Sequence, residues 1–327
     1  MKYRKLGQTG IEVSDIALGA YPIARQQQRS DGTIEVWSGA SDDESIALIH
    51  RAEELGVNLL DSAEGYGGGH SEILVGQALK NRRDKWVIAT KVQPNRGLDK
   101  DRPDEDAVRK HIVSACEDSL KRMQTDFIDV YQLHSIPHEW AMPAVMESFA
   151  KLKTEGKIRW YGISTNNQEA VKKLQVFGPI HTLQIGYNML ERSADAFLHW
   201  AKEQDIGTLI RVPLAKGQLT GKYFGKNAEA IPENDLRYER FQRAEVQEGL
   251  KKLPELLFLQ NEKRTMVQAA LRFVLDHLGV SCAIAGAKNR EQIEANVKAS
   301  DLAPLTQGEL DRALPIADQV GTARWIG

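Results

Sequence analysis

The stretch "SDDESIALIHRAEELGVNLLDSAEGYG", residues 41–67, holds one complete helix-and-strand unit of this chain. Ser41 with Glu44 three residues later forms a capping box, which predicts the start of a helix. Gly56 is a typical stop signal for that helix. The apolar run that follows predicts a short buried strand over residues 57–60. One segment therefore shows a helix that leads directly into a strand.

The same alternation extends through the whole chain. Eight short runs rich in apolar and β-branched residues are separated by longer segments of helical period, two of which end at Gly156 and Gly279. The predicted strands are Ile16–Leu18, Val57–Leu60, Trp86–Thr90, Phe127–Leu133, Trp160–Ile163, Thr182–Ile185, Thr208–Ile210 and Ser281–Ala285. Strands that alternate with helices pair in parallel, and eight such units close into a barrel.

We therefore predict an α/β fold, a (β/α)8 TIM barrel, in which residues 1–327 form a single domain. An open doubly wound sheet is the alternative, but no Gly-x-Gly-x-x-Gly follows the first strand. The opening "KYRKLGQTGIEVS" predicts an N-terminal hairpin that plugs the bottom of the barrel. Long loops follow strand 1 (22–40) and strand 7 (213–263), and the second contains a predicted helix over residues 244–260. Long loops in compact domains are usually functional.

Composition narrows the classes of function. A net charge of −2 gives no reason to expect nucleic acid or an anionic membrane as a partner. No apolar stretch approaches the ~18 residues of a membrane span. Two cysteines, Cys116 and Cys282, predict neither a disulfide framework nor a metal cluster. We expect a cytoplasmic protein without a metal.

Polar side chains appear where the predicted strands stop. Strand 2 ends in Asp61, strand 3 in Lys91, strand 4 in His134 and strand 5 in Ser164. Taken singly, each has an ordinary explanation, such as a helix cap, a snorkelling lysine or a core histidine. In a barrel, however, the carboxyl ends of the strands all meet at one rim, where active sites lie. Together they predict a site there.

The residue types point to one kind of chemistry. A buried carboxylate at Asp61 would hold the Lys91 ammonium charged. We expect that cation to lower the pKa of Tyr66, five residues after Asp61, below its usual ~10. Tyr66 could then donate a proton, with His134 as a second hydrogen-bond donor. Such a pair suits an oxygen that gains charge when hydride adds to a carbonyl. A Schiff-base aldolase built on Lys91 is a rival, but it needs a neutral lysine.

Longer motifs carry a family resemblance. In chain order they are "GVNLLDSAEGYGGGHSEILVGQAL", "VIATK", "DFIDVYQLH", "GIS", "LQIGYNMLER", "VPLAKGQLTGKY" and "GAKNREQIEANV". Together with the opening "LGQTGIEVS", these motifs resemble the aldo-keto reductase superfamily over nearly the whole chain. The resemblance implies a (β/α)8 barrel that binds NADP(H). It also implies a catalytic tetrad, matched here by Tyr66, Lys91, Asp61 and His134.

The resemblance also implies a set of cofactor-binding residues. For the nicotinamide these are Ser164, either Thr165 or Asn166, Gln184, and Arg211 in place of a stacking tyrosine. For the pyrophosphate they are Leu214, Gly217, Leu219 and Lys222. For the adenosine 2′-phosphate and adenine they are Gly286, Lys288, Gln292 and Asn296. A guanidinium can also stack on a ring, and Lys288 favours NADP over NAD. The alternatives are a helix cap at residues 164–166 and a solvated helix start capped by Asn289.

The sequence thus predicts an NADPH-dependent reductase of a small aldehyde or ketone. Tyr21, Trp37 and Trp325 are candidates for the substrate pocket. The alternative is a regulatory subunit that binds NADP(H) with little turnover, similar to potassium-channel beta subunits of this fold. The substrate, the preferred direction and the oligomeric state are left open.

Overall fold

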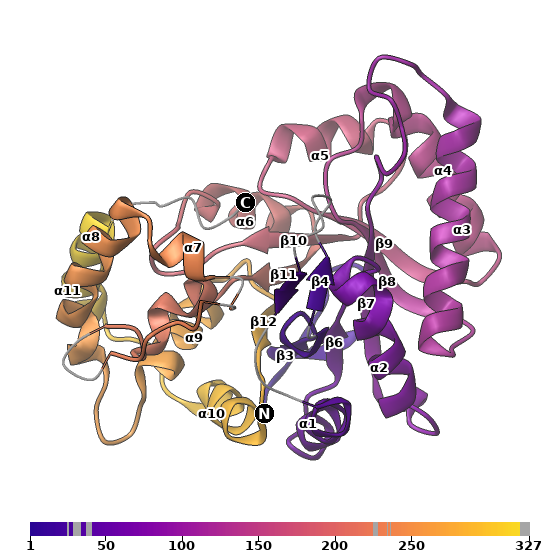
Figure 1. Ribbon diagram of the computed structural model, residues 1–327. Coiled ribbons are helices and arrows are strands. Elements are labelled where there is room, and N and C mark those ends of the chain that lie inside the picture. Colours follow the sequence, from indigo (N-terminus) through magenta and orange to yellow (C-terminus); the bar gives the residue numbers. More distant parts are fainter. Residues whose placement is uncertain are drawn as a thin grey trace.

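Eight parallel strands close into a barrel in chain order, which confirms the predicted fold (Figure 1). The computed structural model describes residues 1–24, 26–28, 34–36, 41–224, 228–233, 235 and 237–320. The barrel strands are β3 (Ile16–Gly19), β6 (Leu59–Asp61), β7 (Val87–Val92), β8 (Ile128–Leu133), β9 (Ile158–Ser164), β10 (Thr182–Gly186), β11 (Gly207–Arg211) and β12 (Cys282–Gly286). β12 pairs with β3 to close the ring.

Helices surround the barrel, and their ends follow the signals in the sequence with one exception. They are α1 (Asp42–Glu54), α2 (His70–Ala78), α3 (Glu105–Met123), α4 (Met142–Thr154), α5 (Gln168–Gln175), α6 (Asp195–Glu203), α9 (Met266–Leu275) and α10 (Arg290–Lys298). The predicted capping box of α1 is present. The stop predicted at Gly279 is wrong, because α9 ends at Leu275 and the chain turns before the glycine. Gly279 instead packs against α6, where an added Cβ would lie 2.3 Å from the Leu198 carbonyl oxygen.

The predicted N-terminal hairpin is present as β1 (Tyr3–Lys5) and β2 (Glu12–Ser14). Its apolar residues Leu6 and Val13 are fully buried and pack with inward-facing residues of the barrel strands such as Leu59 and Leu209. Gly7 bridges to Ile206, directly before β11. The hairpin therefore closes the end of the barrel that carries the amino ends of the strands.

The two long loops carry more regular structure than the sequence predicted. After β3 come η1 (Pro22–Ala24) and a second hairpin, β4 (Gln26–Gln28) with β5 (Ile34–Val36). β4 lies against the turn η2 (Tyr66–Gly69). The segment after β11 holds η5 (Ala215–Thr220), α7 (Tyr238–Phe241), α8 (Ala244–Lys252) and η6 (Leu253–Leu259). The single helix expected over 244–260 thus changes to a 3₁₀ helix at Leu253, next to Pro254.

The remaining elements complete the outer layer. They are η3 (Arg83–Lys85), η4 (Glu139–Ala141), η7 (Ala299–Asp301) and α11 (Gln307–Val320). α11 packs beside α8 and η6, on the flank of the barrel (Figure 1). Within the described part of the chain, no helix is both long enough and apolar enough to cross a membrane.

We predict that the hairpin seal contributes strongly to stability. Leu6→Ala should lower the free energy of unfolding by about 2–5 kcal/mol, because it leaves a cavity in a packed core. The exposed Gln8→Ala in the same turn is the control and should change stability by less than about 0.5 kcal/mol. Urea denaturation measures the free energy of unfolding of both variants. Equal values for Leu6→Ala and Gln8→Ala would contradict a stabilising role for the buried Leu6 side chain.

Candidate active site

Alternation along the strands places polar side chains inside the barrel. Leu59 packs in the lower interior layer, so Asp61, two residues on, faces the same interior one layer higher. Ala89 and Lys91 are related in the same way on β7. The upper end of the barrel interior is therefore polar, although every residue of β6 and β7 is buried.

Asp61 and Lys91 form an ion pair that is sealed from solvent. Lys91 Nζ lies 2.7 Å from Asp61 Oδ2, and the lysine side chain is fully buried. The other carboxylate oxygen, Asp61 Oδ1, accepts a hydrogen bond of 2.7 Å from Gln184 Nε2. Gln184 also donates to Gln132 at 3.4 Å. Gln184, expected at the nicotinamide, thus also positions the Asp61 carboxylate.

Lys91 uses all three of its donors. Besides Asp61 Oδ2, its ammonium donates to the Ser62 carbonyl oxygen at 2.6 Å and to the Tyr66 hydroxyl oxygen at 3.3 Å. An ammonium group has three hydrogens and no acceptor. The tyrosine therefore accepts from the lysine, and its own hydrogen remains to be donated to another group.

The turn that carries Tyr66 is built from glycines. Gly67, Gly68 and Gly69 all have positive φ, between 61° and 98°. Residues with a Cβ rarely adopt these conformations. The turn reverses the chain immediately after β6, so the Tyr66 ring lies back over Lys91, with Nζ 4.9 Å from the ring centre.

Burial decides the protonation of Tyr66. The sequence analysis expected Lys91 to lower the pKa of Tyr66, and that prediction is wrong. Burial raises the pKa of Tyr66 above its usual value, and the nearby Lys91 cation only partly opposes this. Burial alone would lower the pKa of Lys91, but the facing Asp61 carboxylate outweighs it and raises that pKa. Burial raises the pKa of Asp61 against the pull of Lys91. The pair keeps its proton on the lysine, and the phenol stays protonated at neutral pH.

His134 completes the group at the rim. Its ring meets the Tyr66 ring edge-on, with centroids 5.7 Å apart. Burial lowers the pKa of His134 to about 3, and the cations Lys91, Arg211 and Arg96 add to the shift. The imidazole is therefore neutral at physiological pH, and it can donate one hydrogen bond without carrying a charge.

The structure separates the roles of the polar residues after β9. Asn167, which the sequence analysis did not single out, caps α5 by accepting from the Ala170 amide. The side chain of Asn166 is bound to the backbone of Gly186 through both its oxygen and its nitrogen, each at 2.8 Å. Thr165 Oγ1 accepts from the Asn167 amide. Ser164 is the last residue of β9 and is 8% exposed.

Arg211 ends β11 and reaches toward the same rim. Its Nη2 donates to Asn166 Oδ1 at 3.2 Å. Its Nε is buried and has no hydrogen-bond partner within the described residues. Burial lowers the pKa of Arg211, whereas Tyr66 raises it.

The turn η5 has the features of a phosphate cradle. Ala215, Lys216 and Gly217 have positive φ in succession, which bends the backbone sharply. Gln218 Nε2 is a buried donor without a partner in the described part of the chain. Leu219, however, is fully buried in the hydrophobic core, so its side chain supports the turn from behind. A strained turn and an unused donor fit a bound pyrophosphate.

A second cluster faces the end of β12. Lys288 Nζ lies 3.8 Å from Asp235 Oδ2, and Asp235 is bound on both oxygens by Arg237 at 2.8 Å. Arg237 also donates to the Lys216 carbonyl oxygen at 3.4 Å. Neither Asp235 nor Arg237 was predicted, because the segment around them shows no periodicity.

The other predicted cofactor residues lie in the same region. Gln292 Oε1 accepts from the Lys288 amide at 2.8 Å, and Asn296 Nδ2 donates to the Gly286 carbonyl oxygen at 3.3 Å. These two side chains hold the loop after β12. The predicted cap Asn289 is present and accepts from the Gln292 amide.

Two further predicted positions flank η5, one on each side. Leu214 directly precedes the turn and is partly buried. Lys222 is exposed, and its Nζ lies 3.8 Å from Glu229.

Of the three substrate-pocket candidates, the structure describes only Tyr21. Its ring centre lies 4.7 Å from that of Tyr66, so it lines the space next to the phenol. Trp37 and Trp325 lie outside the described residues. Gln132, which was not predicted, is buried inside the barrel and donates to Thr182 Oγ1 at 3.2 Å. The sequence could have indicated Gln132, because a residue two positions before His134 lies on the same face of the strand as His134.

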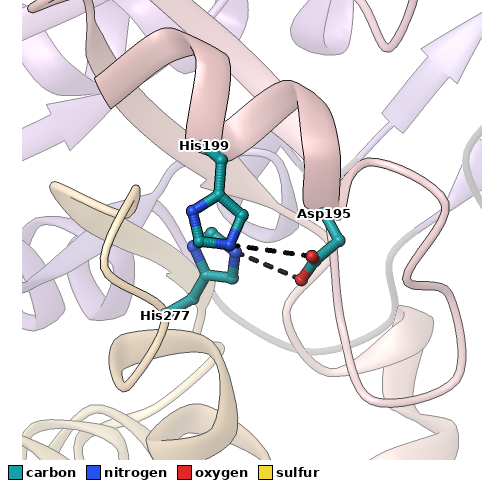
Figure 2. Close-up of side chains that lie close together, drawn as sticks. All are labelled: Asp195, His199 and His277. Carbon is teal, nitrogen blue, oxygen red and sulfur yellow. Dashed lines mark ion pairs between the residues drawn. The ribbon is translucent and has the colours of Figure 1, made fainter. Parts of the chain in front are cut away.

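Three residues that can bind metals meet between α6 and the segment after α9. Figure 2 shows Asp195 and His199 on α6 facing His277 from the segment after α9. His277 Nε2 lies 3.2 Å from Asp195, but His277 Nδ1 accepts a hydrogen bond from the Gly279 amide. A neutral ring then carries its proton on Nε2, the atom that would bind a metal. The cluster fits a carboxylate–histidine pair better than a ligand set, and the absence of a metal stays a prediction.

Comparison with known proteins agrees with this geometry. The sequence model of the Aldo/keto reductase family matches residues 16–314. The chain belongs to this family. It is 35% identical over 309 residues to the aldo-keto reductase YhdN of Bacillus subtilis, which covers 90% of this chain and 87% of that protein.

Two other relatives of this aldo-keto reductase differ in their described roles. A probable voltage-gated potassium channel subunit beta of Arabidopsis thaliana is 31% identical, with 93% of each chain covered. The crystal structure of an aldo-keto reductase from Klebsiella pneumoniae in complex with NADPH superposes with a TM-score of 0.70 and 25% identity. That match covers 96% of this chain and 94% of the other.

The low pKa of His134 predicts a dependence of stability on pH. In the folded protein His134 stays neutral down to about pH 3, whereas in the unfolded chain it takes up a proton below about pH 6.5. Stability therefore falls as the pH drops through this window, by up to about 1.4 kcal/mol per pH unit. Between pH 6.5 and 4.5, wild type should lose about 2 kcal/mol more than His134→Gln in urea denaturation. Equal losses would mean that folded His134 is charged.

Proposed function

We propose that this protein is an NADPH-dependent reductase that converts a small aldehyde or ketone into an alcohol. The observation that carries the proposal is the hydrogen bonding of Lys91. Its three donors are directed at Asp61, Ser62 and Tyr66, which leaves the phenol hydrogen of Tyr66 to be given away. A protonated phenol at the mouth of a closed barrel, beside a neutral imidazole, matches the needs of a carbonyl oxygen that gains charge.

The residues of this chain handle the proton. A carbonyl oxygen between Tyr66 and His134 would accept a hydrogen bond from each. When bound, NADPH supplies the hydride. As charge develops on the oxygen, Tyr66 gives up its proton, and Lys91 at 3.3 Å stabilises the phenolate that forms. Asp61 keeps Lys91 charged throughout, because its carboxylate remains bound to both Lys91 and Gln184.

The cofactor would lie across the rim from β9 to β12. The unused donor of Gln218 and the strained turn at Gly217 suit the pyrophosphate. Lys288 suits the 2′-phosphate, since the nearby Asp235 is already neutralised by Arg237. Ser164 and Arg211 are the last residues of β9 and β11 at the rim, and we assign them to the nicotinamide end of the cofactor.

A regulatory subunit is the second candidate function. Similarity to a probable potassium channel subunit beta favours it, because that relative covers nearly the whole chain. Such a protein would bind NADPH but turn it over slowly. An aldolase with Lys91 as a Schiff base is disfavoured, since the Asp61 carboxylate raises the pKa of Lys91 and leaves it protonated.

The first test removes the proton donor. Tyr66→Phe should lower NADPH consumption with an activated aromatic aldehyde by at least about 100-fold, the usual contribution of a general acid, while NADPH binding is kept. Tyr131→Phe is the matched control, because its buried hydroxyl has no partner among the described residues. Equal rates for Tyr66→Phe and wild type would contradict the role of Tyr66. Tight NADPH binding without turnover in wild type would favour the regulatory subunit.

The second test concerns the choice of cofactor. Lys288→Met should weaken NADPH binding by about 10- to 100-fold, the value of a hydrogen bond to a charged group, and leave NADH binding unchanged. Lys298→Met, an exposed lysine at the far end of α10, the helix that follows Lys288, is the control. Fluorescence titration measures both dissociation constants. A parallel loss for NADPH and NADH would mean that Lys288 does not contact the 2′-phosphate.

A further inference from the structure

A chain of polar side chains runs through the interior of the barrel and ends at the ion pair of Lys91. Gln132 Nε2 on β8 lies 3.2 Å from Thr182 Oγ1 on β10. Gln184 Nε2, also on β10, lies 3.4 Å from Gln132 Oε1 and 2.7 Å from Asp61 Oδ1. None of the four residues in this chain is more than 3% exposed. The hydrogen bonds must therefore be satisfied by the protein itself.

The Asp61 carboxylate sets the direction of the hydrogen bonds in this chain. An ionised carboxylate can only accept, so Gln184 must present its amide nitrogen to Asp61. The second hydrogen of that nitrogen is left for Gln132 Oε1, and Gln132 Nε2 then donates to Thr182. With the amide of Gln132 turned over, two nitrogen donors would face each other. Gln132 is therefore the second anchor of the Gln184 amide, after Asp61.

This arrangement leaves the amide oxygen of Gln184 for a ligand. Both hydrogens of the amide nitrogen are taken by Asp61 and Gln132, whereas the oxygen accepts no hydrogen bond from the residues that the structure describes. The family resemblance places Gln184 at the nicotinamide, whose carboxamide carries N–H donors that suit such an oxygen. The orientation of one amide thus determines both contacts of Gln184, one with the ion pair and one with the cofactor.

The position of Gln132 makes a role in packing alone unfavourable. Val130, two residues earlier on the same face of β8, packs in an apolar cluster, so an apolar side chain suits this interior. A buried amide instead loses its hydration, and hydrogen bonds must offset that loss. The neighbouring strand β9 makes room for the polar chain at Gly162, where an added Cβ would lie 2.3 Å from Thr182 Oγ1.

We propose that Gln132 is a positioning residue, which holds the Gln184 amide with its nitrogen on Asp61 and its oxygen available to the nicotinamide. This inference rests on the proposed reductase function and adds to it a residue that touches neither substrate nor cofactor. Burial raises the pKa of Asp61, and the hydrogen bond from Gln184 is one of the contacts that oppose this rise. By holding Gln184, Gln132 helps to keep Asp61 ionised. Asp61 in turn keeps Lys91 charged for the phenolate of Tyr66.

A double-mutant cycle tests whether Gln132 acts through Gln184. Gln132→Met and Gln184→Met each replace an amide with an unbranched apolar side chain of similar length. In the wild-type background, Gln132→Met should lower kcat/KM for an activated aromatic aldehyde by about 3- to 10-fold, the value of one hydrogen bond. In the Gln184→Met background it should lower kcat/KM by less than about 2-fold, because the group that it positions is gone. Equal losses in the two backgrounds would overturn the proposal.

Further variants separate positioning from support of the fold. Tyr131→Phe, on the same strand, removes a buried hydroxyl without a partner among the described residues and should leave kcat/KM unchanged. Gln132→Glu should stay within about 2-fold of wild type at about pH 6, because burial keeps its carboxylic acid protonated. The neutral acid can still accept from Gln184 and donate to Thr182. A Gln132→Glu variant as impaired as Gln132→Met would contradict the proposal.

Thr182→Val is the substitute if Gln132→Met does not fold, because it keeps the size of the side chain and removes only the acceptor for Gln132 Nε2. It should lower kcat/KM by less than Gln132→Met, and the loss should vanish in the Gln184→Met background. If the polar chain served only the fold, these substitutions would lower the melting temperature of the ligand-free protein, and any loss of kcat/KM would be the same in both backgrounds.

NADPH binding keeps this proposal distinct from the proposed reaction. Fluorescence titration gives the NADPH dissociation constants of the four proteins of the cycle without any turnover. If wild type reduces no aldehyde, the reductase proposal fails. The role of Gln132 then stands only if Gln132→Met weakens NADPH binding by about 3-fold or more in wild type and has no such effect in Gln184→Met. If wild type turns over and the losses in the cycle add, the reductase stands and the role of Gln132 fails.

Discussion

The ion pair between Lys91 and Asp61 is the constraint on which the rest of the site depends. It lies inside a closed barrel, where the Lys91 side chain is fully buried and Asp61 nearly so, so the protein must satisfy most of the hydrogen-bonding capacity of each group. The structure meets this requirement with Gln184 on the carboxylate and the Ser62 carbonyl on the ammonium. One donor of the ammonium is left for Tyr66. The catalytic chemistry that we propose thus follows from the need to satisfy a buried lysine.

The closed bottom of the barrel makes this polar interior possible. The hairpin residues Leu6 and Val13 fill the lower end with apolar side chains, and the strands add layers of the same character. Water can therefore reach the Lys91–Asp61 pair only from the rim. A dry interior strengthens each electrostatic contact inside it, and the same dryness raises the pKa of Tyr66. One architectural feature both sustains the ion pair and keeps the phenol protonated.

The repeated strand pattern predicted the barrel, and polar residues at the strand ends predicted the group that meets at its rim. These predictions were possible because the alternation of side chains and the direction of the strands determine where Asp61, Lys91 and His134 lie. The conformations of the loops have little influence on these three positions. The pKa of Tyr66 was predicted in the wrong direction, since sequence shows a neighbouring cation but not the depth of burial. Asp235 and Gln218 could not be predicted, because their positions depend on loop conformations that leave no periodic signal.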